Sequence, residues 1–132
     1  MAKTFSFNAK EKLKSRRLLE QLFAEGKSFS VFPLKVIYMH VEPALDFPVK
    51  IGVGTSTRYF KKAVDRNRIK RLLRENYRLN KLPLHELVDT NKKQLAVFFL
   101  YIDKTMEGCG LLPEKMKTAL NKLTVIIGQS NK

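Results

Sequence analysis

The chain has 132 residues, with 26 Lys and Arg against 12 Asp and Glu, and therefore a formal charge of +14. That length corresponds to one domain, residues 1–132, and the 44% hydrophobic content excludes a chain that is disordered throughout. The charge indicates a polyanionic partner, and nucleic acid is favoured over an anionic membrane surface. The single Cys109 and the lack of an apolar run of about 18 residues predict a cytoplasmic protein without a membrane partner.

The first expected element is a helix that follows Ser15 and ends at Gly26. Its apolar residues at helical spacing are Leu18, Leu19, Leu22 and Phe23. Ser15 is a suitable N-cap, and Gly26 can adopt the left-handed conformation that often ends a helix. The two ends of the chain, about residues 1–10 and 128–132, are expected to be loosely held.

Two segments with the composition of β-strands follow this helix. Residues 34–41 are rich in β-branched and aromatic residues and lie between two prolines. In the second segment, Val49, Ile51 and Val53 alternate with small or polar residues, which is typical of a half-buried strand. Because only the turn from Pro43 to Pro48 separates the two strands, we expect them to pair as a hairpin.

The segment 58–81 carries 10 basic and 2 acidic side chains, which is more than half of the net charge. Its apolar residues Ile69, Leu72, Leu73 and Leu79 fall within about a third of the circumference of a helix. The other side carries Arg66, Asn67, Arg68, Lys70, Arg71, Arg74 and Arg78. A merely solvated helix would interleave Glu with Lys, so this face predicts binding to a polyanion.

The remaining elements complete a mixed α+β pattern. A short helix is expected after Pro83, and the unbroken apolar run 94–102 predicts a central strand covered on both faces. A turn is expected at residues 108–110 before a last helix from Pro113. Its expected core residues are Met116, Leu120, Leu123 and Ile127. This order predicts a small sheet with helices packed on it.

No group of residues has the composition of an active site. His40 and His85 lie in different elements without other ligands at metal-binding spacing, so structural roles are favoured. Cys109 has no evident base partner and is expected to be a structural thiol. The glycine-rich residues 52–57 lack the Lys-Ser/Thr ending of a phosphate-binding loop. We therefore expect a binding surface and no catalytic residue in this chain.

Residues 62–75 resemble the signature helix of the bacterial ribonuclease P protein subunit, whose pattern is Ala-Val-x-Arg-Asn-Arg-x-Lys-Arg-x-x-Arg. Residues 63–74 fill every fixed position, and the resemblance extends over roughly residues 12–127. It implies a single-domain α/β sandwich of order α-β-β(-β)-α-β-α. Its central sheet would be mainly antiparallel, with a left-handed βαβ crossover where right-handed crossovers are the rule.

The resemblance also implies the activity and its division between RNA and protein. Ribonuclease P cleaves precursor tRNA endonucleolytically to give the mature 5′ end, and its RNA subunit performs the hydrolysis. Mg²⁺ is expected mainly on that RNA, and the protein fold needs no cofactor. The implied partners are ribonuclease P RNA and the 5′ leader of precursor tRNA, with no obligate protein partner.

Two binding regions follow from the resemblance. The one for ribonuclease P RNA comprises Arg58, Lys61, Lys62, Arg66, Asn67, Arg68, Lys70, Arg71 and Arg74. The other is a cleft for the single-stranded leader, formed by Leu19, Phe23, Ile37, Tyr38 and Tyr59. Leu19 stands where the family has an aromatic residue, and residues 57–61 depart from the family's Ser-Lys-Lys-x-Gly loop. Within that loop, Phe60 is expected in the core and Tyr59 half-exposed.

Two alternatives use the same basic helix. A structural RNA-binding protein of ribosomal type would explain the charge but not the full spacing of the motif. A DNA-binding module would place the helix in a major groove, yet a recognition helix usually reads bases with a few positions and not with a wide arc of arginines.

Overall fold

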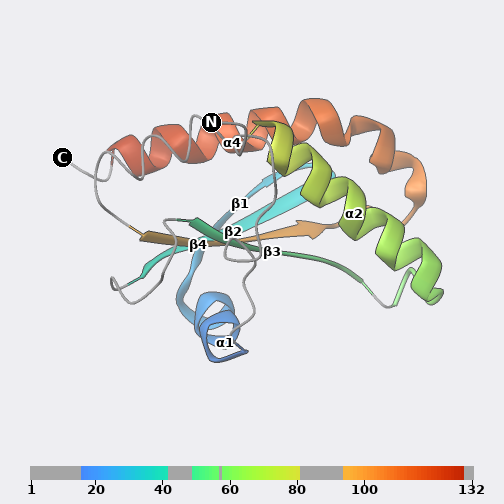
Figure 1. Ribbon diagram of the computed structural model, residues 1–132, viewed down its shortest axis with the longest axis horizontal. Coiled ribbons are helices and arrows are strands. Elements are labelled where there is room, and N and C mark those ends of the chain that lie inside the picture. The colour runs from blue at the N-terminus through green and yellow to red at the C-terminus, as the bar shows by residue number, and fades with distance from the viewer. Residues whose placement is uncertain (1–15, 42–48, 57, 81–93, 130–132) are drawn as a thin grey trace.

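The computed structural model describes residues 16–41, 49–56, 58–80 and 94–129. Its elements are α1 (Arg16–Glu25), β1 (Lys27–Val31), β2 (Leu34–Val41), β3 (Val49–Thr55), α2 (Ala63–Asn80), β4 (Gln94–Tyr101), the 3₁₀ helix η3 (Met106–Leu111) and α4 (Leu112–Gln129). The helices α2 and α4 cover one face of a four-stranded sheet, and α1 lies on the other face (Figure 1). The predicted α+β class is confirmed. The helix expected after Pro83, the cap Ser15 and the chain ends lie outside the described residues.

The strands lie in the order β1-β2-β4-β3. The β1–β2 and β2–β4 pairs are antiparallel, whereas β3 and β4 are parallel and joined by the crossover through α2. The predicted hairpin between β2 and β3 is therefore wrong, because β4 lies between them. A strand that is apolar on both faces is best buried at the centre of a sheet, and the glycine-containing β3 takes the edge. The central position predicted for residues 94–102 is confirmed, and the left-handed sense of the crossover stays a prediction.

The main core lies between the sheet and the helices α2 and α4. Its contributions from the two helices are Ile69, Leu73, Tyr77, Leu112, Met116, Ala119, Leu120, Leu123 and Ile127, all at most 2% exposed. The core face predicted for α4 is thus confirmed, but Leu79 of α2 is 54% exposed. Leu79 lies about 120° around the helix from Leu73, whereas Tyr77 follows Leu73 by one turn and packs on Phe99. Tyr77 therefore takes the core position that the sequence assigned to Leu79.

The helix α1 packs on the opposite face of the sheet through the fully buried Leu22, which contacts Ile37 and Ala96. The N–H of Gly26, the residue after the helix, donates a 2.8 Å hydrogen bond to the carbonyl oxygen of Leu22, in the regular helical pattern. The left-handed conformation predicted for Gly26 is wrong, since no described glycine has a positive φ. Glycine is required there for space, because a Cβ would lie 2.5 Å from that same carbonyl oxygen.

The segment expected as a turn at residues 108–110 forms part of η3. The Thr105 side chain accepts a hydrogen bond from the N–H of Glu107 and caps this short helix. Gly108 is buried in it, and a Cβ there would lie 2.7 Å from the hydroxyl oxygen of Tyr101. The end of β4 and the start of α4 are therefore joined by a closely packed connection.

Candidate nucleic-acid interface

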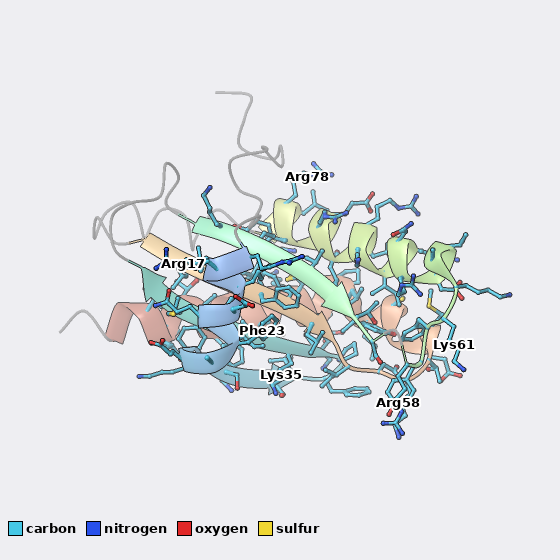
Figure 2. All side chains as sticks on the ribbon, turned by 90° about the horizontal axis from the view of Figure 1, so that it is seen from below. Arg17, Phe23, Lys35, Arg58, Lys61 and Arg78 are labelled. Carbon is cyan, nitrogen blue, oxygen red and sulfur yellow. The ribbon has the colours of Figure 1, made fainter. Side chains whose placement is uncertain are left out.

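The outward side of α2 and the loop before it carry side chains of almost one sign. The exposed members are Arg58, Lys61, Lys62, Asn67, Arg68 and Arg71, and the partly exposed ones are Arg66, Lys70, Arg74 and Arg78. The acidic residues on α2 are Asp65 and Glu75. Figure 2 shows Lys61 before the first turn of α2 and Arg78 toward its other end, so the basic side chains follow the whole helix. We call this surface the α2 face.

Arg66 of the α2 face is bound to the backbone of the preceding loop. Its Nη1 atom donates 2.8 Å hydrogen bonds to the carbonyl oxygens of both Phe60 and Lys61. Phe60 is 5% exposed, as predicted, and its ring lies 5.9 Å from that of Tyr101, centroid to centroid. Arg66 therefore joins α2 to the preceding loop, while its neighbours Asn67 and Arg68 are exposed.

A second surface lies on the α1 side of the sheet, where the Phe23 ring packs edge-on against the Phe98 ring of β4 with 5.0 Å between centroids. Phe23 is 53% exposed. The register places Phe98 between Ile37 of β2 and Gly52 of β3, and a Cβ at Gly54 would lie 2.7 Å from the Phe98 ring. Gly54 thus leaves room for the Phe98 ring on this face of the sheet. We call Leu19, Phe23, Ile37 and Phe98 the Phe23 face.

The structure brings together only part of the predicted leader-binding set. Leu19 and Ile37 belong to the same apolar cluster as Phe98, the contact of Phe23. Tyr38 lies on the opposite face of the sheet, in the main core, because successive strand residues point to opposite sides. Tyr59 lies in the loop before α2 and is 42% exposed, as predicted, without a place in the Phe23 face.

Two residues near these surfaces were not predicted from the sequence. Phe98 was hidden within the continuous apolar run 94–102, where alternation of the two faces is invisible. Lys104, whose Nζ lies 5.5 Å from the centroid of the Tyr59 ring, follows β4 in a segment with no charge pattern. A count of alternate positions along β4 would have placed Phe98 with Ala96 and Leu100, away from the core-facing Phe99.

Three further properties of the described residues concern metal ligands, a buried phenol and membrane crossing. In this part of the chain, no three His, Cys, Asp or Glu side chains are grouped closely enough to hold a metal ion. Burial raises the pKa of the Tyr101 phenol far above its usual value, and a hydrogen bond with the half-buried Cys109 thiol adds to this. Within the same ranges, no helix combines the length and the apolar composition that a bilayer crossing requires.

Fold and surface together define a small α+β protein with the basic surface that is typical of nucleic-acid-binding domains. The profile of the family Ribonuclease P matches residues 7–123. The Ribonuclease P protein component of Porphyromonas gingivalis is 30% identical over 120 residues, which cover 91% of this chain and 88% of the relative. That of Nitrosococcus oceani is 37% identical over 76 residues, or 58% of this chain and 61% of the relative.

Solved structures agree with these sequence matches. The RNase P protein from Thermotoga maritima has a TM-score of 0.63 at 25% identity, over 85% of this chain and 96% of that chain. That of Staphylococcus aureus shares the fold, with a TM-score of 0.64 at 20% identity over 86% and 94% of the two chains. The chain therefore belongs to the ribonuclease P protein family, and so to the protein components of an endoribonuclease complex.

Proposed function

We propose that this chain is the cytoplasmic protein subunit of a ribonuclease P that cleaves precursor tRNA to give its mature 5′ end. The observation that carries this proposal is the α2 face, where exposed basic residues follow one helix in the spacing of the family motif. Its partner is ribonuclease P RNA, as membership of the ribonuclease P protein family implies. A long basic surface suits that role, because it binds a phosphate backbone.

The α2 face suits RNA phosphates in geometry as well as in charge. Arginine presents a planar fork of donors that matches two phosphate oxygens, and Arg68 and Arg71 are exposed to do so. Arg58, Lys61 and Lys62 extend the basic surface before the N-terminus of α2, where the unpaired backbone N–H groups favour anions. We assign Arg66 the task of positioning this loop, with Asn67, Lys70 and Arg74 completing the contact surface.

The Phe23 face is the proposed site for the single-stranded leader. Stacking of bases on an exposed aromatic ring tolerates any base, as a leader of variable sequence requires. Phe23 supplies this ring, and its contact with Phe98 of the central strand holds the ring in position. Lys35 lies on the same side of the sheet, where Figure 2 shows it beside Phe23. Its ammonium group can bind a leader phosphate.

Catalysis is assigned to the RNA subunit and its Mg²⁺ ions. Asp65 and Glu75, the carboxylates of α2, are ten positions apart along the helix, about 15 Å, and so do not jointly hold one ion. The role of the protein is then to bind, to orient the leader and to offset phosphate repulsion between the two RNAs. The protein alone is expected to cleave nothing.

Reconstitution with a bacterial ribonuclease P RNA tests the proposal. Adding the full chain is expected to raise precursor-tRNA affinity and turnover at low Mg²⁺, with cleavage at the mature 5′ end. A matched control is a variant with Arg68, Arg71 and Arg74 replaced by glutamine, which removes charge from the α2 face. No gain from the wild-type protein, together with co-purification of ribosomal RNA from cells, would instead favour a ribosomal type of binder.

A further inference from the structure

We propose that Tyr59 is a separate binding site for one unpaired RNA nucleotide. The base stacks on the Tyr59 ring, and Arg58 and Lys104 bind the phosphates that flank it. This inference rests on the proposed function, which makes the chain an RNA-binding protein, and it adds a second stacking position to the Phe23 face.

Two segments that are distant in the sequence place cations around the Tyr59 ring. The Cζ atom of Arg58 lies 5.7 Å from the ring centroid, and the Nζ atom of Lys104 lies 5.5 Å from it. Both cationic side chains are exposed, and the ring itself is 42% exposed. An accessible aromatic ring beside two exposed cations has the components of a nucleotide site, namely a π-face and phosphate ligands.

The loop that carries Tyr59 is held at several points. Ser56 accepts hydrogen bonds from the N–H groups of Arg58, through its Oγ atom at 3.0 Å, and of Phe60, through its carbonyl oxygen at 3.2 Å. The next residue, Phe60, is buried, and Arg66 binds the Phe60 and Lys61 carbonyl oxygens. A ring whose neighbours Arg58 and Phe60 are held in this way loses little conformational freedom on binding, so stacking on it adds to affinity.

The two cations beside the Tyr59 ring can leave the ring and bind a phosphate instead. Cation–π attraction is weak at exposed positions, so an incoming base can displace Arg58 or Lys104 from the ring. The acidic neighbour of Lys104 is Asp103, whose Oδ1 atom accepts hydrogen bonds from the N–H and hydroxyl of Thr105. That carboxylate is thereby directed to the η3 cap, which leaves the Lys104 ammonium for an RNA phosphate.

This site is distinct from the Phe23 face. Figure 2 shows Phe23 on α1 over the sheet and Arg58 well away from it, in the loop beyond β3. The Phe23 ring packs on Phe98, whereas the Tyr59 ring lies beside the cations Arg58 and Lys104. The two rings therefore bind different nucleotides, and their removal has separable effects.

The chain contains no tryptophan, so Tyr59→Trp creates a single fluorescent reporter at the site. The probe is a single-stranded oligoadenylate of about eight nucleotides, within the site sizes of single-strand binding domains. We expect its binding to the full chain to quench the tryptophan emission of Tyr59→Trp. The control is Val125→Trp, at a 58% exposed position on α4, whose emission should stay unchanged.

Affinity measurements with the same probe separate stacking from charge. Tyr59→Leu should weaken binding by about tenfold, as expected for the loss of one stacked base, whereas Tyr59→Phe should match the wild type. Tyr59→Leu should leave the salt dependence unchanged, while Arg58→Ala and Lys104→Ala should each lower the log–log slope by about 0.7. Unquenched Tyr59→Trp emission together with equal affinities of the Leu, Phe and wild-type proteins would overturn the proposal.

The source of the nucleotide is found by competition. Precursor tRNA displacing the probe better than mature tRNA identifies the leader, and displacement by ribonuclease P RNA identifies an unpaired position of that RNA; either result supports the site. Because these measurements use the protein alone, they remain decisive if reconstitution of ribonuclease P fails. The wild-type protein could stimulate cleavage fully while the Tyr59 variants show neither quenching nor a change in affinity. That result would reject the site and leave the proposed function intact.

Discussion

The guanidinium group of Arg66 is bound to the backbone of Phe60 across the start of α2. Its Nη1 atom lies 2.8 Å from the Phe60 carbonyl oxygen and 2.8 Å from that of Lys61. The Arg-Asn-Arg motif at residues 66–68 therefore combines two tasks. Arg66 holds the loop that carries Arg58 and Tyr59, and Arg68 is exposed to a partner.

Single alanine variants of Arg66 and Arg68 separate these tasks. Arg68→Ala should lower the log–log salt slope of ribonuclease P RNA binding by about 0.7–0.9, because one phosphate contact is lost. Arg66→Ala should leave that slope nearly unchanged and lower the free energy of unfolding by about 1 kcal/mol, since it removes hydrogen bonds from a charged donor. Binding over a salt series and urea unfolding provide the two measurements.

Arg66→Lys is the control for charge at this position. It keeps the positive charge but loses the planar donor group, so it should resemble Arg66→Ala in stability. If Arg66→Ala lowers the salt slope as much as Arg68→Ala while Arg66→Lys restores it, Arg66 binds a phosphate and the positioning role is wrong.

Phe23→Ala tests the Phe23 face. It removes the exposed ring that packs on Phe98, so precursor tRNA should bind about tenfold more weakly while mature tRNA is unaffected. Affinity for ribonuclease P RNA alone should stay near the wild-type value, because the α2 face lies on the other side of the sheet. Phe23→Tyr keeps the ring and should bind as the wild type does. Equal losses for both tRNAs would contradict a leader site at Phe23.

The helical parts of this fold were predictable from the sequence because their signals are local. The buried side of each helix follows directly from the spacing of its apolar residues, which is that of Ile69 and Leu73 in α2 and recurs in α4. Strand pairing is not local, and the short connection between β2 and β3 favoured a hairpin. The observed order arises because β4, which is apolar on both faces, is best buried at the sheet centre and so lies between β2 and β3.

The candidate site was predictable where a motif fixed it and not where two elements meet. The basic residues of α2 follow from the helical period, but the inward bond of Arg66 depends on where the preceding loop folds back. Ile37 and Tyr38 are neighbours in sequence, and only the register shows that Ile37 alone faces α1. The contact of Lys104 with Tyr59 joins two loops, for which the sequence has no signal.

Gly26→Ala should destabilise the protein strongly. The added Cβ would lie 2.5 Å from the Leu22 carbonyl oxygen and 3.1 Å from that of Tyr38, so backbone must shift, at a cost of about 1–3 kcal/mol. Gly110→Ala is the matched control, because its Cβ meets nothing within 4 Å, and it should change stability by less than about 0.5 kcal/mol. Urea unfolding compares the two; equal stability would show that α1 can move away from β2 without cost.

Tyr101 should make the stability of the fold depend on pH in the alkaline range. Its buried hydroxyl donates a 2.7 Å hydrogen bond to the Thr105 carbonyl oxygen, and burial raises its pKa above that of an unfolded chain, about 10. Above about pH 10 the unfolded state thus binds fewer protons than the folded state, and stability falls as the pH rises. Below that pH the contribution of this phenol is constant.

Tyr101→Phe removes this titration together with the hydrogen bond. The wild type should be more stable by about 1 kcal/mol at neutral pH, because the variant lacks the bond to Thr105. That advantage should shrink as the pH rises through about 10, since only the wild type gains from ionising in its unfolded state. Urea unfolding of both proteins from about pH 7 to about pH 11 measures the difference, from which the lysine titrations common to both proteins largely cancel. A difference that stays constant over this range would mean that the Tyr101 phenol ionises as readily in the folded protein as in the unfolded chain, and that its hydroxyl is reached by water.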